Sequence, residues 1–439
     1  MRRDLPWKEV EKKKNIFDFS PWDRLLTALD KADGVRPVFL LGGGNPLYGE
    51  GTPEAGEAFV RFVEAALAHY KGRGILWELG DAPSDLRAYA ALASNVADAF
   101  AKAVPGETLI GPGLAGIDIP TLETIAKTGL LKKLDGLSVH PTRPMEPESV
   151  MADVARLRTA NARAGSPELP ILSSGWGYPT IPGGLGDETQ ADYAARQGLV
   201  LLAAGVPLSI WNEWRNPIPD ARPEAGDSGL LRPDGTPKPA FEALKTVTSV
   251  LGGFRYRMRL AAEKPEDWVL LFDREGRPGL AAWTTGTPHE VEVYPGVKMN
   301  LTPRPQTLVP ERRSLYLDGA LSLPSIPPFV AYEGPEEAAR LLRSVQSSLP
   351  PGGKMDVRLL LPVTGPKRIE LRAGELGSSE AVAKYLSSLP RSPSSQQAPN
   401  TIPTPQTHSS GDKLDSQVAC LMWLFTVWYS SSCCLDKRR

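Results

Sequence analysis

Cysteine is nearly absent from this chain of 439 residues. All three cysteines, Cys420, Cys433 and Cys434, lie in the last twenty residues. The rest of the chain therefore has neither a disulfide framework nor a cysteine-based metal site. For the same reason, cysteine usage does not indicate a redox compartment.

An excess of charge of either sign is also missing. The chain has 50 lysine and arginine residues against 51 aspartate and glutamate residues, which gives a net charge of -1. No summed field is left to attract nucleic acid or an anionic membrane. We expect no nucleic-acid partner, and a neutral partner such as a carbohydrate fits this balance.

The chain lacks the short glycine motifs that bind nucleotides. No Gly-x-Gly-x-x-Gly segment follows the early apolar runs, and Gly42-Gly43-Gly44 is not followed by the Lys-Ser/Thr pair of a phosphate-binding loop. We therefore expect no nucleotide cofactor. The residues suggest no other cofactor and no metal site.

Long apolar runs are missing at both ends. The first residues, Met1 to Trp7, are charged and aromatic and do not form a secretory signal, so the chain as given is expected to be cytoplasmic. Near the other end, Val418 to Trp428 is apolar apart from Thr426. A membrane-spanning helix needs about 20 such residues, so we expect no transmembrane span.

What the chain does have, up to about residue 250, is a regular alternation of short apolar runs with amphipathic helical patterns. This alternation is typical of repeated strand-helix units around a parallel sheet, either a barrel or a doubly wound sheet. The predicted class is therefore α/β. The expected strands are Val38 to Leu41, Ile75 to Glu78, Thr108 to Ile110, Gly136 to Val139, Ile171 to Ser173 and Leu208 to Trp211.

Beyond Gly252 the pattern changes to short strand-like pieces separated by turn residues. We predict a barrel domain over 1–252 and a small β-domain over 253–333 that resembles a β-sandwich. An α/β extension over 334–388 either belongs to the β-domain or forms a separate unit. Residues 389–414 are rich in Ser, Pro, Gln and Thr, so 389–439 are predicted to be a disordered linker followed by a short apolar tail that contains the cysteines.

Two segments carry a family resemblance. Trp77-Glu78-Leu79-Gly80-Asp81-Ala82-Pro83 resembles the Trp-Glu-Ile-Trp-Asn-Glu-Pro segment of retaining glycoside hydrolases of clan A, in particular relatives of families 39 and 5. Ser174-Gly175-Trp176-Gly177-Tyr178 is similar to their Ser-Glu-Trp-Gly-Tyr segment. In those enzymes one Glu is the acid/base and the other is the nucleophile. The matching positions here are Ala82 and Gly175.

The resemblance implies a (β/α)8 barrel followed by a β-domain, and it decides between the two sheet types. It also implies a gap. The segment Arg3 to Trp7 resembles the second barrel strand of relatives, so the first strand and helix are missing, and a barrel of seven strands has two unpaired edges. Either another segment fills the place of the first strand, or the barrel is open, or the chain is an incomplete gene product. Relatives are often secreted, and without the first strand the N-terminus resembles a truncated one.

The site residues follow from the same resemblance. Retaining glycosidases need two carboxyl groups about 5 to 5.5 Å apart, and Ala82 and Gly175 supply none. Asp81 and Glu213 are the weak candidates for relocated carboxylates. Glu78 is expected inside the barrel, paired with a base such as Arg3. The predicted substrate-binding residues, which offer aromatic faces or polar groups to a sugar, are Trp77, Asp81, His140, Trp176, Tyr178, Trp211 and Glu213.

Three functions remain open. The first is a catalytically degenerate glycosidase relative that retains binding of an oligo- or polysaccharide. The second is an active O-glycosyl hydrolase that uses Asp81 and Glu213. The third is a non-enzymatic scaffold whose linker and tail contact a partner. The sequence leaves the sugar, the linkage and the oligomeric state open.

Overall fold

The structure is a computed structural model. It describes residues 1–373 except 33–34, 82–84, 104–105, 167, 181–183, 218–226, 261, 275–276, 295–296, 311–312, 318, 320–322, 324–328, 333 and 361–366. The predicted linker and tail at 389–439, the end of the predicted extension at 374–388, and Ala82 lie outside the described residues. The chain divides into two units between Lys245 and Thr246.

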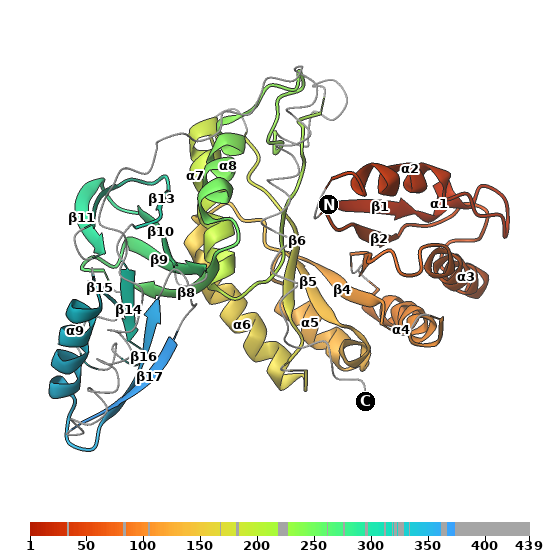
Figure 1. Ribbon diagram of the computed structural model, residues 1–439. Helices are drawn as coiled ribbons and strands as arrows, with labels where there is room; N and C mark the ends of the chain where they lie inside the picture. The colour runs from red at the N-terminus through yellow and green to blue at the C-terminus, as the bar shows by residue number, and fades with distance from the viewer. Residues whose placement is uncertain are drawn as a thin grey trace. The chain divides into compact units, whose positions relative to one another are not determined.

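The first unit is built around a parallel sheet of seven strands, arranged in chain order from β1 to β7 (Figure 1). This confirms the predicted α/β class and the incomplete barrel. Each predicted apolar run forms a strand, and Arg2–Pro6 pairs in parallel with the next strand. The strands are β1 Arg2–Pro6, β2 Val38–Gly42, β3 Leu76–Leu79, β4 Thr108–Ala115, β5 Gly136–His140, β6 Ile171–Trp176 and β7 Ser209–Trp211.

Helices connect the strands, as the amphipathic patterns predict. The third helix has Thr52 as its N-cap, and the Thr52 hydroxyl accepts from the backbone N–H of Ala55, 3.2 Å away. The helices are α1 Trp7–Val10, α2 Ser20–Leu29, α3 Pro53–His69, α4 Leu86–Ala103, α5 Ile119–Ala126, α6 Val150–Arg163, α7 Asp187–Ala203 and α8 Pro239–Leu251. Two single turns of 3-10 helix, Leu130–Lys133 and Pro147–Ser149, precede β5 and α6.

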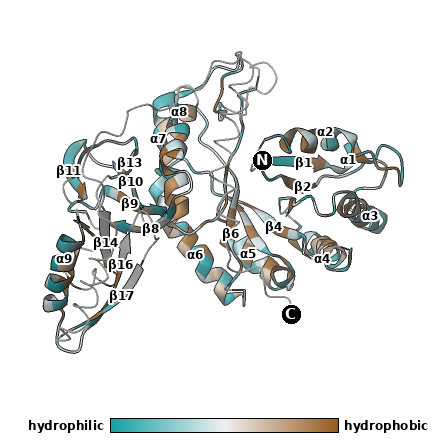
Figure 2. Cartoon of the chain, viewed as in Figure 1, coloured by the Kyte–Doolittle hydropathy of each residue, from teal (hydrophilic) through white to brown (hydrophobic). Residues whose placement is uncertain are grey.

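The interior of the sheet is apolar at the end where the strands begin. Val38, Leu76, Ile110, Leu172 and Leu208 form one buried cluster there. The first strand is different: Figure 2 shows β1 beginning with hydrophilic residues, and it pairs on one side only, with β2. β1 and β7 are the two edges of the sheet, so no strand closes the barrel among the described residues.

The second unit consists of antiparallel sheets and one described helix. One sheet has the order β13-β10-β9-β8, a hairpin pairs β11 with β12, and another sheet has the order β15-β14-β16-β17. Apolar clusters lie between the strands and under the helix. The elements are β8 Arg255–Leu260, β9 Asp267–Arg274, β10 Arg277–Thr284, β11 His289–Tyr294, β12 Val297–Leu301, β13 Gln306–Leu308, β14 Arg313–Leu317, β15 Phe329–Tyr332, α9 Pro335–Ser348, β16 Lys354–Leu360 and β17 Lys367–Arg372.

Candidate functional site

The candidate site lies where β3, β5, β6 and β7 end. The carboxyl ends of parallel barrel strands meet at one edge, and this is the edge at which barrel enzymes carry their chemistry. His140 is the last residue of β5, Gly175 and Trp176 end β6, and Asp81 follows β3 by two residues. The structure thus brings together residues that are up to about a hundred positions apart in the chain.

Glu78 is the centre of a buried polar network below this edge. Its side chain is fully buried. Its Oε1 accepts hydrogen bonds from the hydroxyls of Ser138 at 2.5 Å and Ser174 at 2.6 Å, and its Oε2 accepts from Arg2 Nε at 2.6 Å. We call Glu78, Arg2, Ser138 and Ser174 the Glu78 network. A buried carboxylate with this many donors is a structural anion.

The electrostatics of Glu78 follow from these contacts. Burial raises the pKa of the Glu78 carboxyl, but the His140 ring, the charge and hydrogen bond of Arg2, and the Ser138 hydroxyl together outweigh it and lower the pKa to about 2. Glu78 is therefore ionised at neutral pH and has no proton to donate to a leaving group. The expectation that Glu78 pairs with Arg3 is wrong, because its partner is Arg2. Side chains alternate along a strand, so Arg2 faces the interior and Arg3 does not.

His140 joins the Glu78 network to the open edge. Its Nε2 is 2.9 Å from Ser174 Oγ and 3.6 Å from Glu78 Oε1, and its Nδ1 is 3.7 Å from Asp81 Oδ1. The Asp81 side chain is 61 % exposed, whereas that of His140 is 18 % exposed. A ligand at this edge would therefore meet Asp81 first and the edge of the His140 ring behind it.

The order hydroxyl, imidazole, carboxylate is also that of a nucleophilic triad, but the surroundings of Ser174 argue against that chemistry. Ser174 is fully buried, and its hydroxyl contacts Glu78 Oε1 and Ser138 Oγ as well as His140. An ionised carboxylate is the strongest acceptor of the three, so the Ser174 proton is held by Glu78 and not by the imidazole. The arrangement orients His140; it does not activate Ser174.

Gly175 faces His140. A Cβ at this position would lie 3.6 Å from His140 Cδ2, which is an ordinary van der Waals contact, so a Cβ would fit and would point toward His140. The pairing of β6 with β7 shifts register between Ser173 and Trp176. Such irregularities re-aim side chains next to active sites. The position that resembles the nucleophile is thus directed at the site but carries no carboxylate.

Three of the aromatic residues predicted to stack on a sugar are interior residues. Trp77, Trp176 and Tyr178 are 0 %, 0 % and 1 % exposed. Trp77 packs edge-on against Phe39 and Phe100, and Trp176 donates from Nε1 to Ser209 Oγ at 2.7 Å. Their burial assigns them to packing, because no ring face is left for a ligand.

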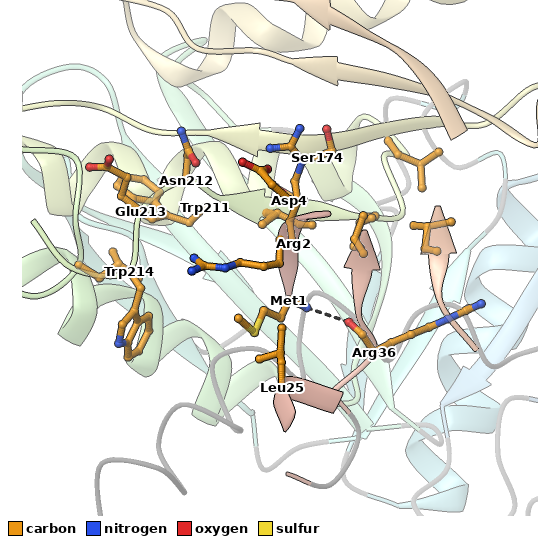
Figure 3. A pocket seen from close by; sticks show the side chains of 18 of the residues that line it. Met1, Arg2, Asp4, Leu25, Arg36, Ser174, Trp211, Asn212, Glu213 and Trp214 are labelled. Atoms are coloured by element: carbon orange, nitrogen blue, oxygen red, sulfur yellow. Dashed lines mark hydrogen bonds between the residues drawn. The ribbon is translucent and has the colours of Figure 1, made fainter. Parts of the chain in front are cut away.

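Trp211 and Glu213 border a large cavity of about 1090 Å³ that lies between β1 and β7 (Figure 3). Trp211 is half-buried, packs edge-on against Trp176 at 4.9 Å between ring centroids, and donates from Nε1 to the Ser228 carbonyl. Glu213 has a φ of 70°, in the left-handed region that non-glycine residues rarely adopt. Its Oε2 is buried without a hydrogen-bond partner among the described residues. Backbone strain such as the left-handed φ of Glu213 is found most often at functional sites.

No group of His, Cys, Asp and Glu residues in the described part of the chain is arranged to hold a metal ion. Of the helices that the structure describes, none is long and apolar enough to cross a membrane. The sequence reasoning missed Arg2, Ser138 and Ser174. Ser138 carried a signal, because it lies between the buried Leu137 and Val139 of a strand, where an interior polar group is expected. Arg2 and Ser174 have no such apolar neighbours on either side.

No protein-family model matches the chain, and no curated protein matches it. Solved structures do match. A family 39 glycoside hydrolase from the gut symbiont Bacteroides cellulosilyticus WH2 has a TM-score of 0.61 and 24 % identity over 70 % of this chain and 74 % of its own. The family 39 enzyme from Xanthomonas axonopodis pv. citri has a TM-score of 0.51 and 15 % identity over 82 % and 79 %.

A family 39 β-xylosidase from Caulobacter crescentus has a TM-score of 0.50 and 18 % identity over 83 % of both chains. Identities this low establish the fold alone. The chain therefore has the fold of the barrel-type glycoside hydrolases, with a seven-stranded incomplete barrel and antiparallel sheets after it.

Proposed function

We propose that this chain is a glycoside-hydrolase-like protein that has lost the two-carboxylate chemistry and binds a carbohydrate at the edge formed by Asp81, His140 and Gly175. The observation that carries the proposal is the state of the carboxylates. Glu78 is fully buried and paired with Arg2, and the position facing His140 is a glycine. Neither can serve as acid or nucleophile, although Asp81 and His140 can still hydrogen-bond to sugar hydroxyls.

The loss of both groups would be severe. General acid/base catalysis contributes typically about 10²- to 10⁴-fold, and without a nucleophile the covalent route is closed. Asp81 follows the strand at the acid/base end, but it is one residue earlier than the position that resembles the acid. Such a displacement moves a carboxylate by ångströms, which is enough to cost about 10²-fold.

A second candidate is an active glycosidase with relocated carboxylates. It is favoured by Glu213, which follows β7 with a left-handed backbone and whose Oε2 has no hydrogen-bond partner among the residues that the structure describes. Both features are typical of a group held for function. Asp81, with 61 % of its side chain exposed, would then be the acid.

One experiment separates the two candidates. The full chain is titrated with xylo- and gluco-oligosaccharides by calorimetry and incubated with aryl β-xylosides and β-glucosides, together with the variants Asp81→Asn, His140→Ala and Glu213→Gln. Asp98→Asn, an exposed carboxylate on α4, is the matched control. Our proposal expects binding that His140→Ala weakens, with no turnover by any variant. Hydrolysis that Asp81→Asn or Glu213→Gln abolishes and Asp98→Asn leaves intact would refute it.

A further inference from the structure

The cavity between β1 and β7 lies in the interval between the two edges of the sheet. β1 and β7 are first and last in the strand order. The cavity is lined on one side by β1 residues from Arg2 to Asp4 and on the other by β7 residues from Ser209 to Trp211. Figure 3 shows labelled side chains from both edges around it. We call this cavity the edge slot.

Both edges direct backbone groups into the edge slot. In a parallel pair, alternate residues direct their N–H and C=O to the same neighbour. The Met1 carbonyl bonds to Val38 of β2, so Arg2 and Asp4 face the other way, into the slot. On β7, Leu208 and Asn212 bond to β6, so Ser209 and Trp211 face the slot. Two parallel edges that face one space have the geometry that receives a strand between them.

The walls of the slot fix the character of that strand. Its inner side would meet Val38 and Leu172 from the sheet interior, and its outer side would meet Leu25 of α2 and Leu244 of α8. A strand covered on both faces is apolar at successive positions, as in other buried parallel strands. At about 3.3 Å per residue, a strand of about five residues matches β1 in length.

The charge at one end of the slot adds a further requirement. A strand parallel to β7 would end beside Glu213, whose Oε2 is buried and has no hydrogen-bond partner in the described part of the chain. A lysine or arginine after the apolar run would supply the missing donor. We propose that the edge slot binds an extended polypeptide segment of about five apolar, β-branched residues followed by a basic residue, added as a parallel strand between β1 and β7.

Trp22 now occupies part of one edge. Its indole Nε1 donates to the Asp4 carbonyl at 2.9 Å, and its ring lines the slot. An incoming strand has to displace this donor to pair with Asp4. The Trp22→Phe variant frees the Asp4 carbonyl but removes apolar surface. If the peptide pairs with the backbone, the variant should bind it more tightly; if the peptide binds by apolar contact alone, the variant should bind it more weakly.

The probe is a fluorescein-labelled synthetic peptide, acetyl-Asn-Val-Ile-Val-Ile-Val-Lys-Asn-amide, titrated into the full chain by fluorescence anisotropy. Binding should be saturable, and Trp22→Phe should tighten it by about threefold to tenfold, the effect of one hydrogen bond. In the bound peptide, alternate residues would direct their N–H groups to β1 and to β7. Methylating the backbone nitrogens of either set of peptide residues should therefore weaken binding at least about tenfold. Exchanging the lysine for glutamate should weaken binding to the unaltered chain more than to Glu213→Gln.

Hydrogen exchange of the full chain is the second readout. The amides of Ser209 and Trp211 should become protected when the peptide is bound, while amides of β17 should not change. Equal binding of the methylated peptides, weaker binding to Trp22→Phe, or no binding at about 1 mM peptide, the limit of a weak complex, would each overturn the proposal. A chain that binds no peptide and elutes as a dimer would assign the edge slot to a second copy, which also overturns it.

Discussion

The Glu78–Arg2 pair gives the most exacting test of this structure, because its energy depends on pH in a known direction. The perturbation is Glu78→Gln, which keeps the shape of the side chain and removes its charge. The pKa of Glu78 is lowered from 4.5 to about 2. That difference corresponds to about 3 kcal/mol of stability at neutral pH, close to the 3 to 5 kcal/mol that breaking a buried ion pair costs.

The pH window follows from the lowered pKa. A carboxyl whose pKa is lower in the folded state stabilises the fold fully above its unfolded pKa, here about 4.5, and loses that effect as the pH falls toward the folded value of about 2. The difference in free energy of unfolding between the unaltered chain and Glu78→Gln should therefore be about 3 kcal/mol at pH 7. It should fall to roughly half of that at pH 3.

The assay is urea unfolding at pH 7, 5, 4 and 3, followed by circular dichroism, on the unaltered chain, Glu78→Gln and Glu123→Gln. Glu123 is an exposed residue of α5 and serves as the control for loss of charge. A destabilisation by Glu78→Gln that is equally large at pH 3 and pH 7 would show that packing, not ionisation, causes it. The electrostatic reasoning about the Glu78 network would then fail.

Three further changes test the packing around the site. Gly175→Ala should change the free energy of unfolding by less than about 1 kcal/mol, since its Cβ would meet only His140 at 3.6 Å. Gly229→Ala should cost at least about 1 to 3 kcal/mol, because its Cβ would lie 2.3 Å from the backbone nitrogen of Asn216. Equal costs of the two variants in thermal unfolding would contradict this. Trp176→Phe should cost about 1 to 3 kcal/mol by stranding the buried Ser209 hydroxyl, with Ser209→Ala in the same background restoring part of the loss. Thr52→Ala should cost about 1 kcal/mol through loss of the α3 cap, and Thr52→Ser should be nearly neutral; a neutral Thr52→Ala in urea unfolding would remove the cap from the account.

The strands could be predicted because buried parallel strands are continuous apolar runs bounded by turn residues. The exception was the end of β4. Gly111-Pro112-Gly113 is typical of a turn, yet the strand continues to Ala115, because Gly113 and Leu114 pair with Ser138 and Val139 of β5. Tertiary pairing overrides local propensity there. Such pairing between strands cannot be predicted from the local sequence of one chain.

The site was predictable only in part, because periodicity does not say which face of a strand is the interior. His140, Asp81 and Gly175 come together as the family resemblance implies. Trp77 and Trp176 belong to the two segments that carry the family resemblance, yet both are buried. An aromatic residue in a strand suits packing and ligand binding equally well, so its type does not distinguish the two roles. Arg2 rather than Arg3 meets Glu78, and a shift of one residue in a strand reverses the face that a side chain occupies.

The candidate site and the edge slot are connected through Arg2. The Arg2 backbone faces the edge slot from β1, and its guanidinium crosses the interior to Glu78 on β3, which contacts the Ser174 hydroxyl beside His140. Among the described strands β1 pairs with β2 alone, so this ion pair is part of what holds the edge in place. A strand added at the slot would pair the other side of β1 and reduce the opening of Arg2 away from Glu78. Occupation of the edge slot should therefore stiffen the ring of His140, because Arg2 and Ser174 line the slot and also belong to the Glu78 network that contacts this ring.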